Sequence, residues 1–398
     1  MTIAPARRAA FDILKKVETQ GAFATDLLAA LPGSMDRRDL NLATELVLGC
    51  LRRQNQLDFL VAHFSGRPAP KFDAEVRVAL RLGAYQLRHL DRIPRSAAVN
   101  DSVSLTRSSG KGSAAGFVNA VLRKVDTSAV KWPNGAVATG LPEWLHARWL
   151  ANYGGAATAR LAEAASRASE TYIHVPAGRE AEVPEGTERT ELAGCYKLPA
   201  GVAPGPFRIQ DIGSQALVPL LELSAGHRFL DLCAAPGNKT AQAMEAGART
   251  VACDHSVKRL HAVQSLGCPL VALNAERPLP FAGRPFDRIL VDAPCSGTGT
   301  LGRNPEIRWR LQPSDIERHR TRQVEILTRA LAVLAPGGKL VYSTCSLEPD
   351  ENEAAVKQVL TRVGPSFAME RTVQRLPGRE PGDGFFAGVI KSNVPRSV

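Results

Sequence analysis

Two cysteines stand in short turns of small residues, where a thiol could act on a substrate. Cys295 lies in DAPCSGTG and Cys345 in YSTCSLEPDENE, and each segment follows a β-rich run. A thiolate is a strong nucleophile that can attack an electron-poor atom. A single cysteine is more often an inert buried thiol. Two cysteines at the ends of successive predicted strands instead favour a chemical role.

The cysteine pattern argues against other uses of sulfur. The chain has seven cysteines, an odd number, and no C-x-x-C pair. This pattern is untypical of a zinc ribbon or a disulfide framework and favours a reducing compartment. Pro294-Cys295 lacks a second cysteine two residues on, and the chain has no H-x-E motif, so a zinc deaminase is excluded. We expect no metal.

A second group of residues predicts a site for a nucleoside-containing cofactor. The segment DLCAAPGNKT (231–240) has small residues that let the backbone approach a ligand ahead of a helix N-terminus. It is neither a G-x-G-x-x-G motif nor a Walker loop. Asp254 ends the next β-rich run, where an acid can accept hydrogen bonds from ribose hydroxyls. The third run ends in Asn274, which could bind an adenine edge, and the fourth ends in Asp292. Asp254 as a helix cap and Asn274 as a turn residue remain alternatives.

The elements that must position these residues form an alternating pattern. From about residue 206, five β-rich runs are mostly followed by helical stretches: HRFLDLCA, RTVACDHS, PLVALNA, FDRILVDAP and GKLVYSTCS. FFAGVIK (385–391) adds a late strand. This alternation predicts a doubly wound parallel sheet, which binds ligands at the carboxyl ends of its strands.

The first third of the chain has a different character. Residues 5–125 are predicted to be all-helical, because Val76, Leu80, Ala84 and Leu87 share one helical stripe. Residues 1–125 carry 19 Lys and Arg against 11 Asp and Glu, a net charge of +8, whereas the rest of the chain carries +3. Such an excess is typical of a module that binds a polyanion, although a solvated basic surface is the alternative. The loop RSSGKGSAAG (107–116) could follow phosphates or simply connect two helices.

Residues 126–205 predict a small α+β region. LPEWLHARWLANYG (141–154) is typical of a helix, with Trp144 and Trp149 in the core. TYIHVPAG (171–178) and CYKLPAG (195–201) predict two strands.

Length and composition set the wider limits. A chain of 398 residues predicts two or three domains, and 44% hydrophobic with 22% charged residues is ordinary for a globular protein. No apolar run is long enough to span a bilayer, and the N-terminus lacks the apolar stretch of a signal peptide. We expect a cytoplasmic protein without a membrane partner.

Several segments together resemble one known family. DLCAAPGNKT, DAPCSGTG and STCSLEPDENE are similar to motifs I, IV and VI of the Nop/Sun family of RNA cytosine-5 methyltransferases. FRIQDIGSQALVPLL (207–221) and DGFFAGVIK (383–391) resemble its flanking segments. LRHLDRIPRSAAVNDSVSLTR (87–107) and GFVNAVLRKV (116–125) are similar to a NusB-type RNA-binding domain.

The resemblance implies a multi-domain protein. It would have an all-α NusB-like domain (1–125), a linker and small α+β subdomain (126–205) and an α/β Rossmann-like methyltransferase domain (206–398). The implied reaction is S-adenosylmethionine-dependent methylation of cytosine C5 in small-subunit (16S) ribosomal RNA. We expect that RNA as the partner and a monomeric enzyme.

The resemblance also implies roles for individual residues. Cys345 would be the nucleophile that adds to C6 of cytosine, Cys295 would help to release the adduct, and Asp292 would activate the base near N3. The residues expected to bind S-adenosylmethionine are Cys233, Ala234, Ala235, Pro236, Gly237, Asn238, Lys239, Asp254, Arg259, Asn274 and Asp292. Arg303, Arg308 and Arg310 in GRNPEIRWR could hold RNA phosphates beside the site, or form a solvated loop.

The sequence departs from the family pattern at three places. Asn238 replaces a usual Gly, which we expect to be tolerated because Asn also visits left-handed conformations. Asn274 replaces a usual Asp but keeps an acceptor, and TYIHVPAG replaces an Arg-x-Asn strand. The target nucleotide therefore stays open. Two alternative functions also stay open: the same chemistry on transfer RNA, and a non-catalytic RNA-binding assembly factor.

Overall fold

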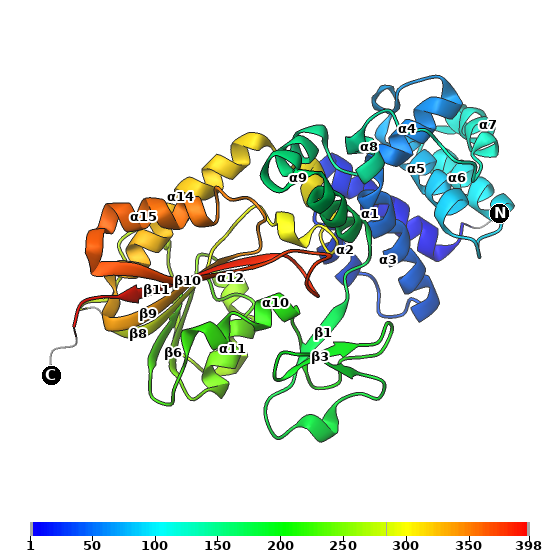
Figure 1. Cartoon of the computed structure of the whole chain (residues 1–398). Helices are drawn as coiled ribbons and strands as arrows, with labels where there is room; N and C mark the ends of the chain where they lie inside the picture. The colour runs from blue at the N-terminus through cyan, green and yellow to red at the C-terminus, as the bar shows by residue number, and fades with distance from the viewer. Residues whose placement is uncertain (1–2, 284, 396–398) are drawn as a thin grey trace. The chain divides into compact units, whose positions relative to one another are not determined.

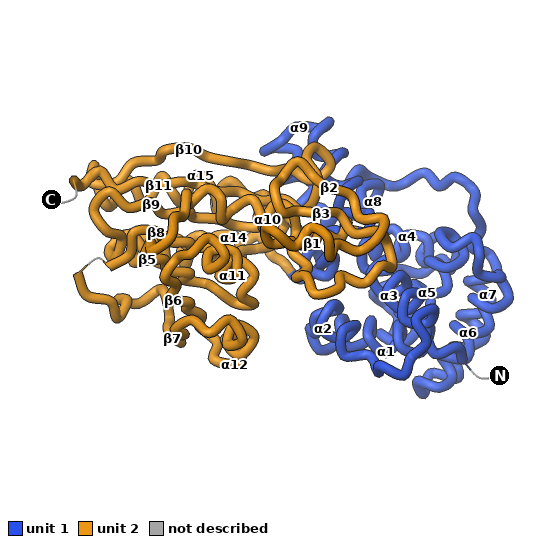
Figure 2. The backbone as a smooth tube through the Cα atoms, turned by 90° about the horizontal axis from the view of Figure 1, so that it is seen from below, with its two compact units in different colours: residues 1–168, 301–310 blue, residues 169–300, 311–398 orange. Residues whose placement is uncertain are grey.

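The computed structural model describes residues 3–283 and 285–395. Contacts between Cα atoms divide the chain into two compact units, coloured separately in Figure 2. Unit 1 comprises Met1–Ala168 and Leu301–Arg310, and unit 2 comprises Ser169–Thr300 and Leu311–Val398. The chain therefore leaves unit 2 after Thr300, contributes one short segment to unit 1, and returns to unit 2 at Leu311.

Unit 1 is helical, as the periodicity predicted. Its helices are α1 (Pro5–Gln20), α2 (Ala24–Ala29), α3 (Arg37–Arg52), α4 (Gln54–Ser65), α5 (Ala74–His89), α6 (Arg95–Ser108), α7 (Ala115–Lys124), α8 (Gly135–Thr139), α9 (Glu143–Ser166) and α13 (Ile307–Arg310). The predicted stripe of α5 is confirmed, because Val76, Leu80, Ala84 and Leu87 are all buried in one apolar core. Burial of such a stripe supplies most of the stability of helices of this length.

The middle of the chain is divided between the two units. The predicted helix forms as the first half of α9, which kinks at Gly154 and buries Trp149, whereas Trp144 is only half-buried. Both predicted strands form, as β1 (Thr171–His174) and β3 (Cys195–Leu198). With β2 (Glu188–Arg189) and β4 (Arg208–Ile209) they make an antiparallel sheet in the order β2-β3-β1-β4. The division into 1–125, 126–205 and 206–398 stays a prediction about separable domains.

A larger sheet forms the centre of unit 2, in the order β10-β11-β9-β8-β5-β6-β7. Its strands are β5 (Arg228–Asp231), β6 (Arg249–Asp254), β7 (Leu270–Ala272), β8 (Phe286–Asp292), β9 (Leu334–Thr344), β10 (Phe367–Arg375) and β11 (Phe385–Ser392). Every β-rich run that the sequence singled out is one of these strands. The strands from β5 to β9 are parallel, which confirms the Rossmann-like class.

The sheet is mixed rather than wholly parallel, which corrects one part of the prediction. Strand β11 runs antiparallel to both β9 and β10. The connection from β10 to β11 spans only residues 376–384, which is too short for a crossover that would keep the strands parallel.

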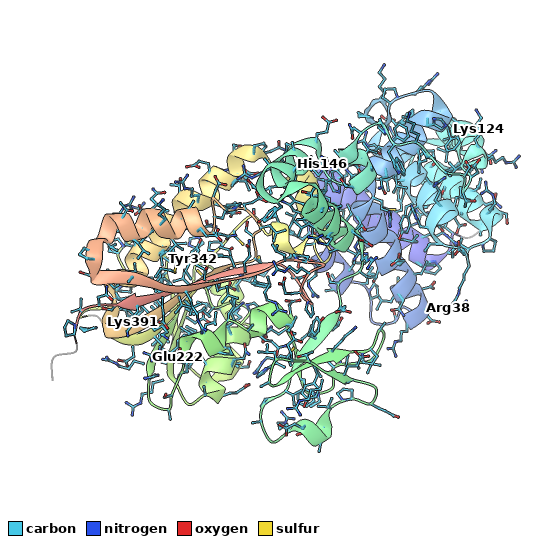
Figure 3. The ribbon with its side chains drawn as sticks, in the orientation of Figure 1. Arg38, Lys124, His146, Glu222, Tyr342 and Lys391 are labelled. Carbon is cyan, nitrogen blue, oxygen red and sulfur yellow. The ribbon has the colours of Figure 1, made fainter. Side chains whose placement is uncertain are left out.

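Helices cover both faces of this sheet. In Figure 1, α14 (Pro313–Ala332) and α15 (Glu353–Val363) lie on one side and α11 (Asn238–Glu245) on the other. Two shorter helices, α10 (Ile212–Gln215) and α12 (Val257–Leu260), complete the unit. Tyr342, labelled in Figure 3, is a fully buried residue of β9 within the sheet. In the part of the chain that the structure describes, no helix is long and apolar enough to cross a membrane.

Candidate active site

The ends of two neighbouring strands bring the two cysteines together. Asp292 at the end of β8 pairs in register with Ser343 near the end of β9. The turns that follow these strands place Cys295 Sγ and Cys345 Sγ 3.3 Å apart. The two cysteines, 50 residues apart in the chain, are therefore in contact. The hydrogen bond with Cys345, together with burial, raises the pKa of the Cys295 thiol well above its usual value.

An ion pair lies at the same strand ends. Lys239 Nζ, in the first turn of α11, is 2.6 Å from Asp292 Oδ2. The Ser343 hydroxyl donates to the other carboxylate oxygen at 2.9 Å. Burial lowers the pKa of the Lys239 ammonium, but the charge of Asp292 and the hydrogen bond with it, followed by the charge of Asp231, raise this pKa overall. A cation of this kind stabilises a thiolate near it.

A small hollow of about 100 Å³ opens beside this ion pair. It is lined by Ser214, Asp231, Cys233, Ala234, Ala235, Pro236, Asn238, Lys239 and Asp292. Seven of these nine lining residues are ones that we expected to bind a cofactor, and they lie together at the ends of β5 and β8. The sequence reasoning omitted Ser214 and Asp231. Asp231 carried a usable signal, since it ends β5 as Asp254 ends β6.

Asp231 has spare capacity to bind a ligand. Its Oδ2 accepts a hydrogen bond from the Thr240 hydroxyl at 2.7 Å. Its Oδ1 is buried and has no hydrogen-bond partner among the described residues. Burial raises the pKa of this carboxyl to about 7, although the Thr240 hydroxyl opposes the shift. Buried polar atoms are nearly always paired, so this oxygen can accept a hydrogen bond from a further donor or lie against a positive charge.

Three other expected cofactor residues lie at the end of β6 or in the segments that follow β6 and β7. Asp254 is buried and accepts backbone N–H groups of Ala235 and Ser256, at 3.2 and 3.0 Å. Arg259 donates to the Ala235 carbonyl at 2.8 Å. The Asn274 side chain accepts the backbone N–H of Glu276 at 2.9 Å, so it forms the turn that the sequence left as an alternative.

The start of α11 explains how Asn238 is accommodated. Gly237 caps the helix with a left-handed φ of 104°, and Asn238 is the first helical residue. The left-handed position is therefore taken by Gly237, and our reason for tolerance at Asn238 was wrong. The Asn238 side chain donates to the Ile209 carbonyl at 3.1 Å instead.

The interpretation of Arg308 as a phosphate-binding residue is also wrong. Arg308 is fully buried in unit 1, where its guanidinium donates to the carbonyls of Arg52, Gly140, Ala165 and Leu301 at 2.7–3.2 Å. Arg310 donates to the Ala22 carbonyl and lies over the Phe23 ring, 4.7 Å from its centroid. The alternative of a solvated loop is therefore also wrong for Arg308 and Arg310, because both guanidinium groups are bound to other parts of unit 1.

Within residues 3–283 and 285–395, no group of three or more His, Cys, Asp or Glu side chains could hold a metal ion. All seven cysteines lie in this part of the chain and are free thiols. The arrangement instead offers two thiols and a carboxylate beside a hollow lined by small residues.

Comparison with known proteins identifies the family. The model of the family described as 16S rRNA methyltransferase RsmB/F matches residues 218–391, and that of the NusB family matches residues 4–127. The chain is 32% identical over 424 residues to ribosomal RNA small subunit methyltransferase B of Xanthomonas campestris pv. campestris, and the match covers 96% of each chain. It is 32% identical over 425 residues to the protein of the same name from Salmonella paratyphi B, with 97% of this chain and 98% of the relative covered.

Solved structures agree on the fold. The crystal structure of PH0851 has a TM-score of 0.79 and 22% sequence identity, and the match covers 98% of this chain and 100% of that one. Similarity over nearly the whole length, together with both family matches, leaves one assignment. The chain belongs to the RsmB/F family of 16S rRNA methyltransferases: it is an S-adenosylmethionine-dependent RNA methyltransferase with an N-terminal NusB domain.

Proposed function

We propose that this enzyme methylates C5 of cytosine in small-subunit ribosomal RNA through a covalent bond between Cys345 and the base. One observation carries the proposal: Cys295 Sγ and Cys345 Sγ lie 3.3 Å apart at the same strand ends as Asp292. One thiol suffices to attack a base. A second thiol within contact distance provides a separate group for the later release step.

Cytosine needs such a nucleophile because its C5 atom does not react readily with a methyl donor. In the first step the Cys345 thiolate forms a bond to C6, and the displaced π electrons make C5 nucleophilic. We assign to Asp292 the activation of the base near N3, where negative charge would otherwise develop. The Lys239 ammonium, held against Asp292, adds a positive charge at the same strand ends.

Release reverses the addition after C5 has gained its methyl group. The C5 proton passes to a solvent water molecule, and the electrons of the C5–H bond restore the C5–C6 double bond. The C6–S bond breaks, and its electron pair returns to sulfur as the Cys345 thiolate. Cys295 is the group that we assign to this step. Its raised pKa supports the assignment, because a thiol that holds its proton at neutral pH does not compete with Cys345 for C6.

The hollow fits the methyl donor of the family. S-adenosylmethionine, when bound, supplies an electrophilic methyl group on a positively charged sulfur. The free Oδ1 of buried Asp231 suits a donor or a positive charge, and the small side chains from Cys233 to Pro236 let the backbone approach a ligand. Asp254, Arg259 and Asn274 would hold the nucleoside end beyond the hollow.

Three features support small-subunit ribosomal RNA as the substrate. The relatives that match over nearly the whole length are named for this RNA. Residues 4–127 match the NusB family, and residues 1–125 carry a net charge of +8, which suits a polyanion. A base must leave its stack to reach Cys345, so an accessible loop is the expected target. We further propose a cytoplasmic enzyme that acts as a monomer without a metal.

The deciding experiment is transfer of labelled methyl groups to unmodified small-subunit ribosomal RNA. Nucleoside mass spectrometry would then identify the product, and we expect 5-methylcytosine. Labelling of transfer RNA in its place would support the second candidate substrate. A methylated nucleoside other than 5-methylcytosine would contradict the covalent mechanism.

Two variants test the roles of the cysteines separately. Cys345→Ala is expected to abolish methyl transfer while the protein still folds and binds S-adenosylmethionine. Cys295→Ala is expected to accumulate a covalent RNA adduct, seen as a retarded band on a denaturing gel. Full activity of Cys345→Ala would show that the nucleophile is misassigned.

A further inference from the structure

A buried carboxylate, Glu351, contacts the two turns that carry the cysteines. Glu351 lies in the loop between β9 and α15 and is fully buried. Removing a carboxylate from water is costly unless hydrogen bonds satisfy it. The donors that satisfy Glu351 come from the two turns that carry Cys295 and Cys345.

Each carboxylate oxygen of Glu351 has two donors. Oε1 accepts the backbone N–H of Ser296 at 2.9 Å and the Gln323 amide at 3.0 Å. Oε2 accepts the hydroxyl of Ser346 at 2.5 Å and also the hydroxyl of Ser296. Four donors use the full accepting capacity of an ionised carboxylate, and charge-assisted hydrogen bonds of this kind are strong.

The positions of these donors in the chain matter most. Ser296 directly follows Cys295, and Ser346 directly follows Cys345. The two hydroxyls are themselves 2.9 Å apart. Gln323, on α14, also donates to the Pro294 carbonyl at 3.0 Å, immediately before Cys295. Glu351 therefore binds residues adjacent to both cysteines with a single side chain.

Neighbouring contacts fix the position of Glu351 itself. The Tyr342 hydroxyl donates to the Glu351 carbonyl at 2.6 Å. The next residue, Asn352, donates to the Ser346 carbonyl at 3.0 Å and accepts the Thr344 hydroxyl at 2.5 Å. Thr344 and Ser346 flank Cys345, so the backbone on both sides of this cysteine is held as well.

We propose that Glu351 is a positioning residue that holds the Cys295 and Cys345 turns together and thereby sets the distance between their sulfur atoms. Among the described residues, the carboxylate of Glu351 is hydrogen-bonded to Ser296, Gln323 and Ser346 and not to either thiol. Its effect on the cysteines is therefore transmitted through Ser296 and Ser346. An effect of Glu351 on catalysis is expected only if the proposed function is correct, because in that function both thiols act on one base. An effect of Glu351 on the distance between the two sulfur atoms is expected whatever the enzyme's reaction is.

The first test therefore needs no RNA. Diamide oxidises two adjacent thiols to a disulfide and takes up their two hydrogens on its N=N bond. In the wild-type chain we expect rapid formation of a Cys295–Cys345 disulfide, which mass spectrometry of the linked peptides would detect. Glu351→Ala is expected to slow this disulfide about a hundredfold, because small misplacements of reacting atoms have effects of that size.

The second test uses steady-state kinetics of methyl transfer on the same variants. Glu351→Ala is expected to lower kcat about a hundredfold with an unchanged KM for S-adenosylmethionine, because the hollow does not include Glu351. Glu351→Gln keeps the side-chain volume and one carbonyl oxygen, so it is expected to lie between the wild type and Glu351→Ala in both measurements. If Glu351→Ala does not fold, Ser346→Ala takes its place, because it removes one of the hydroxyl donors to Glu351. It is then expected to slow disulfide formation and to lower kcat.

Glu353→Gln is the matched control, since Glu353 is exposed two residues away on the same segment. It is expected to behave as the wild type in both tests. A folded Glu351→Ala variant with wild-type disulfide formation and wild-type kcat would overturn the proposal. A slowed disulfide in Glu351→Ala, combined with a wild-type enzyme that makes no 5-methylcytosine, would refute the proposed function and retain the positioning role.

Discussion

Residues 295–300 and 301–310 follow one another in the chain, yet buried charges of opposite sign hold them in two different units. In unit 2, the Glu351 carboxylate accepts hydrogen bonds from Ser296 and Ser346. In unit 1, the Arg308 guanidinium donates only to backbone carbonyls in the contacts that the structure gives, including those of Gly140 and Ala165. Three of the four donors to Glu351 are side-chain groups, whereas all four acceptors of Arg308 are backbone carbonyls.

The C-termini of three helices explain why the buried charge in unit 1, that of Arg308, is positive. Arg52 is the last residue of α3, Gly140 caps α8, and Ala165 lies in the last turn of α9. Carbonyls at helix C-termini lack partners within the helix and carry partial negative charge. Arg308 stabilises three such ends at once. Its role is therefore to build unit 1, and the role of Glu351 is to arrange chemical groups in unit 2.

The largest effect is expected from Arg308→Met, which breaks the arrangement in unit 1. Removing the guanidinium leaves four buried carbonyls without their donor, and we expect a loss of about 3–5 kcal/mol in the free energy of unfolding. All four tryptophans, at 132, 144, 149 and 309, belong to unit 1, so urea unfolding followed by tryptophan fluorescence reports on this unit.

Arg318→Met is a suitable control, because the Arg318 side chain is 78% exposed on α14. Surface substitutions of this kind usually change stability by less than about 0.5 kcal/mol. Equal unfolding midpoints for Arg308→Met and Arg318→Met would show that the helix ends do not need the cation.

A smaller effect is expected from Gly299→Ala, which separates the two cysteine turns in unit 2. Gly299 N–H donates to the Cys345 carbonyl at 2.9 Å, and Gly384 N–H donates to the Gly299 carbonyl at 2.8 Å. A Cβ at this position would lie 2.4 Å from the Gly384 carbonyl oxygen. We expect the free energy of unfolding, measured by thermal unfolding, to fall by about 1–3 kcal/mol, as at other overpacked sites. The rate of methyl transfer should fall as well. Gly112→Ala meets open space and should change neither property.

Asp231 and Glu351 are both buried carboxylates, but only Asp231 has an oxygen, Oδ1, without a hydrogen-bond partner among the described residues. Its pKa of about 7 means that it binds a proton below neutral pH in the folded protein. A positively charged ligand favours the ionised form, so affinity for S-adenosylmethionine should increase about tenfold between pH 6 and pH 8. Calorimetric titration would measure this trend, and Asp231→Asn should remove it while the ligand's own titration remains. An identical pH dependence in both proteins would contradict the role of Asp231.

The smallest effect is expected from Arg310→Ala, in the same segment as Arg308. Its guanidinium lies over the Phe23 ring and donates to one carbonyl, so it stabilises far less than the buried Arg308. We expect a loss of about 1 kcal/mol in the tryptophan-monitored unfolding of unit 1. A loss as large as that of Arg308→Met would mean that the whole segment, rather than one guanidinium, holds the helix ends.

Local patterns made much of the fold predictable. The strands from β5 to β9 are short apolar runs with polar ends, and the stripe of α5 has the period of a helix. Strand β10 was missed because most of its residues are exposed or half-buried and its sequence FAMERTVQR is largely polar. An edge strand with few buried residues has little periodic signal.

The candidate site was predictable for a similar reason, with instructive exceptions. Cofactor and catalytic residues fall at strand ends, and parallel strands bring their carboxyl ends to one edge of the sheet. Arg308 was misinterpreted because a guanidinium that binds phosphate and one that binds carbonyl oxygens look identical in sequence. Glu351 received no role because its donors lie in two turns that are distant in the chain.

The sequence by itself determined which elements form and which chemical groups stand at their ends, because apolar periodicity and turn residues act over a few neighbouring positions. It placed Asp292 at the end of β8, Cys295 after β8 and Cys345 after β9. Only the tertiary structure decided the 3.3 Å separation of the thiols, the free oxygen of Asp231 and the four donors around Glu351. These features depend on burial and on contacts between distant segments, and no local pattern encodes which donor will meet which acceptor.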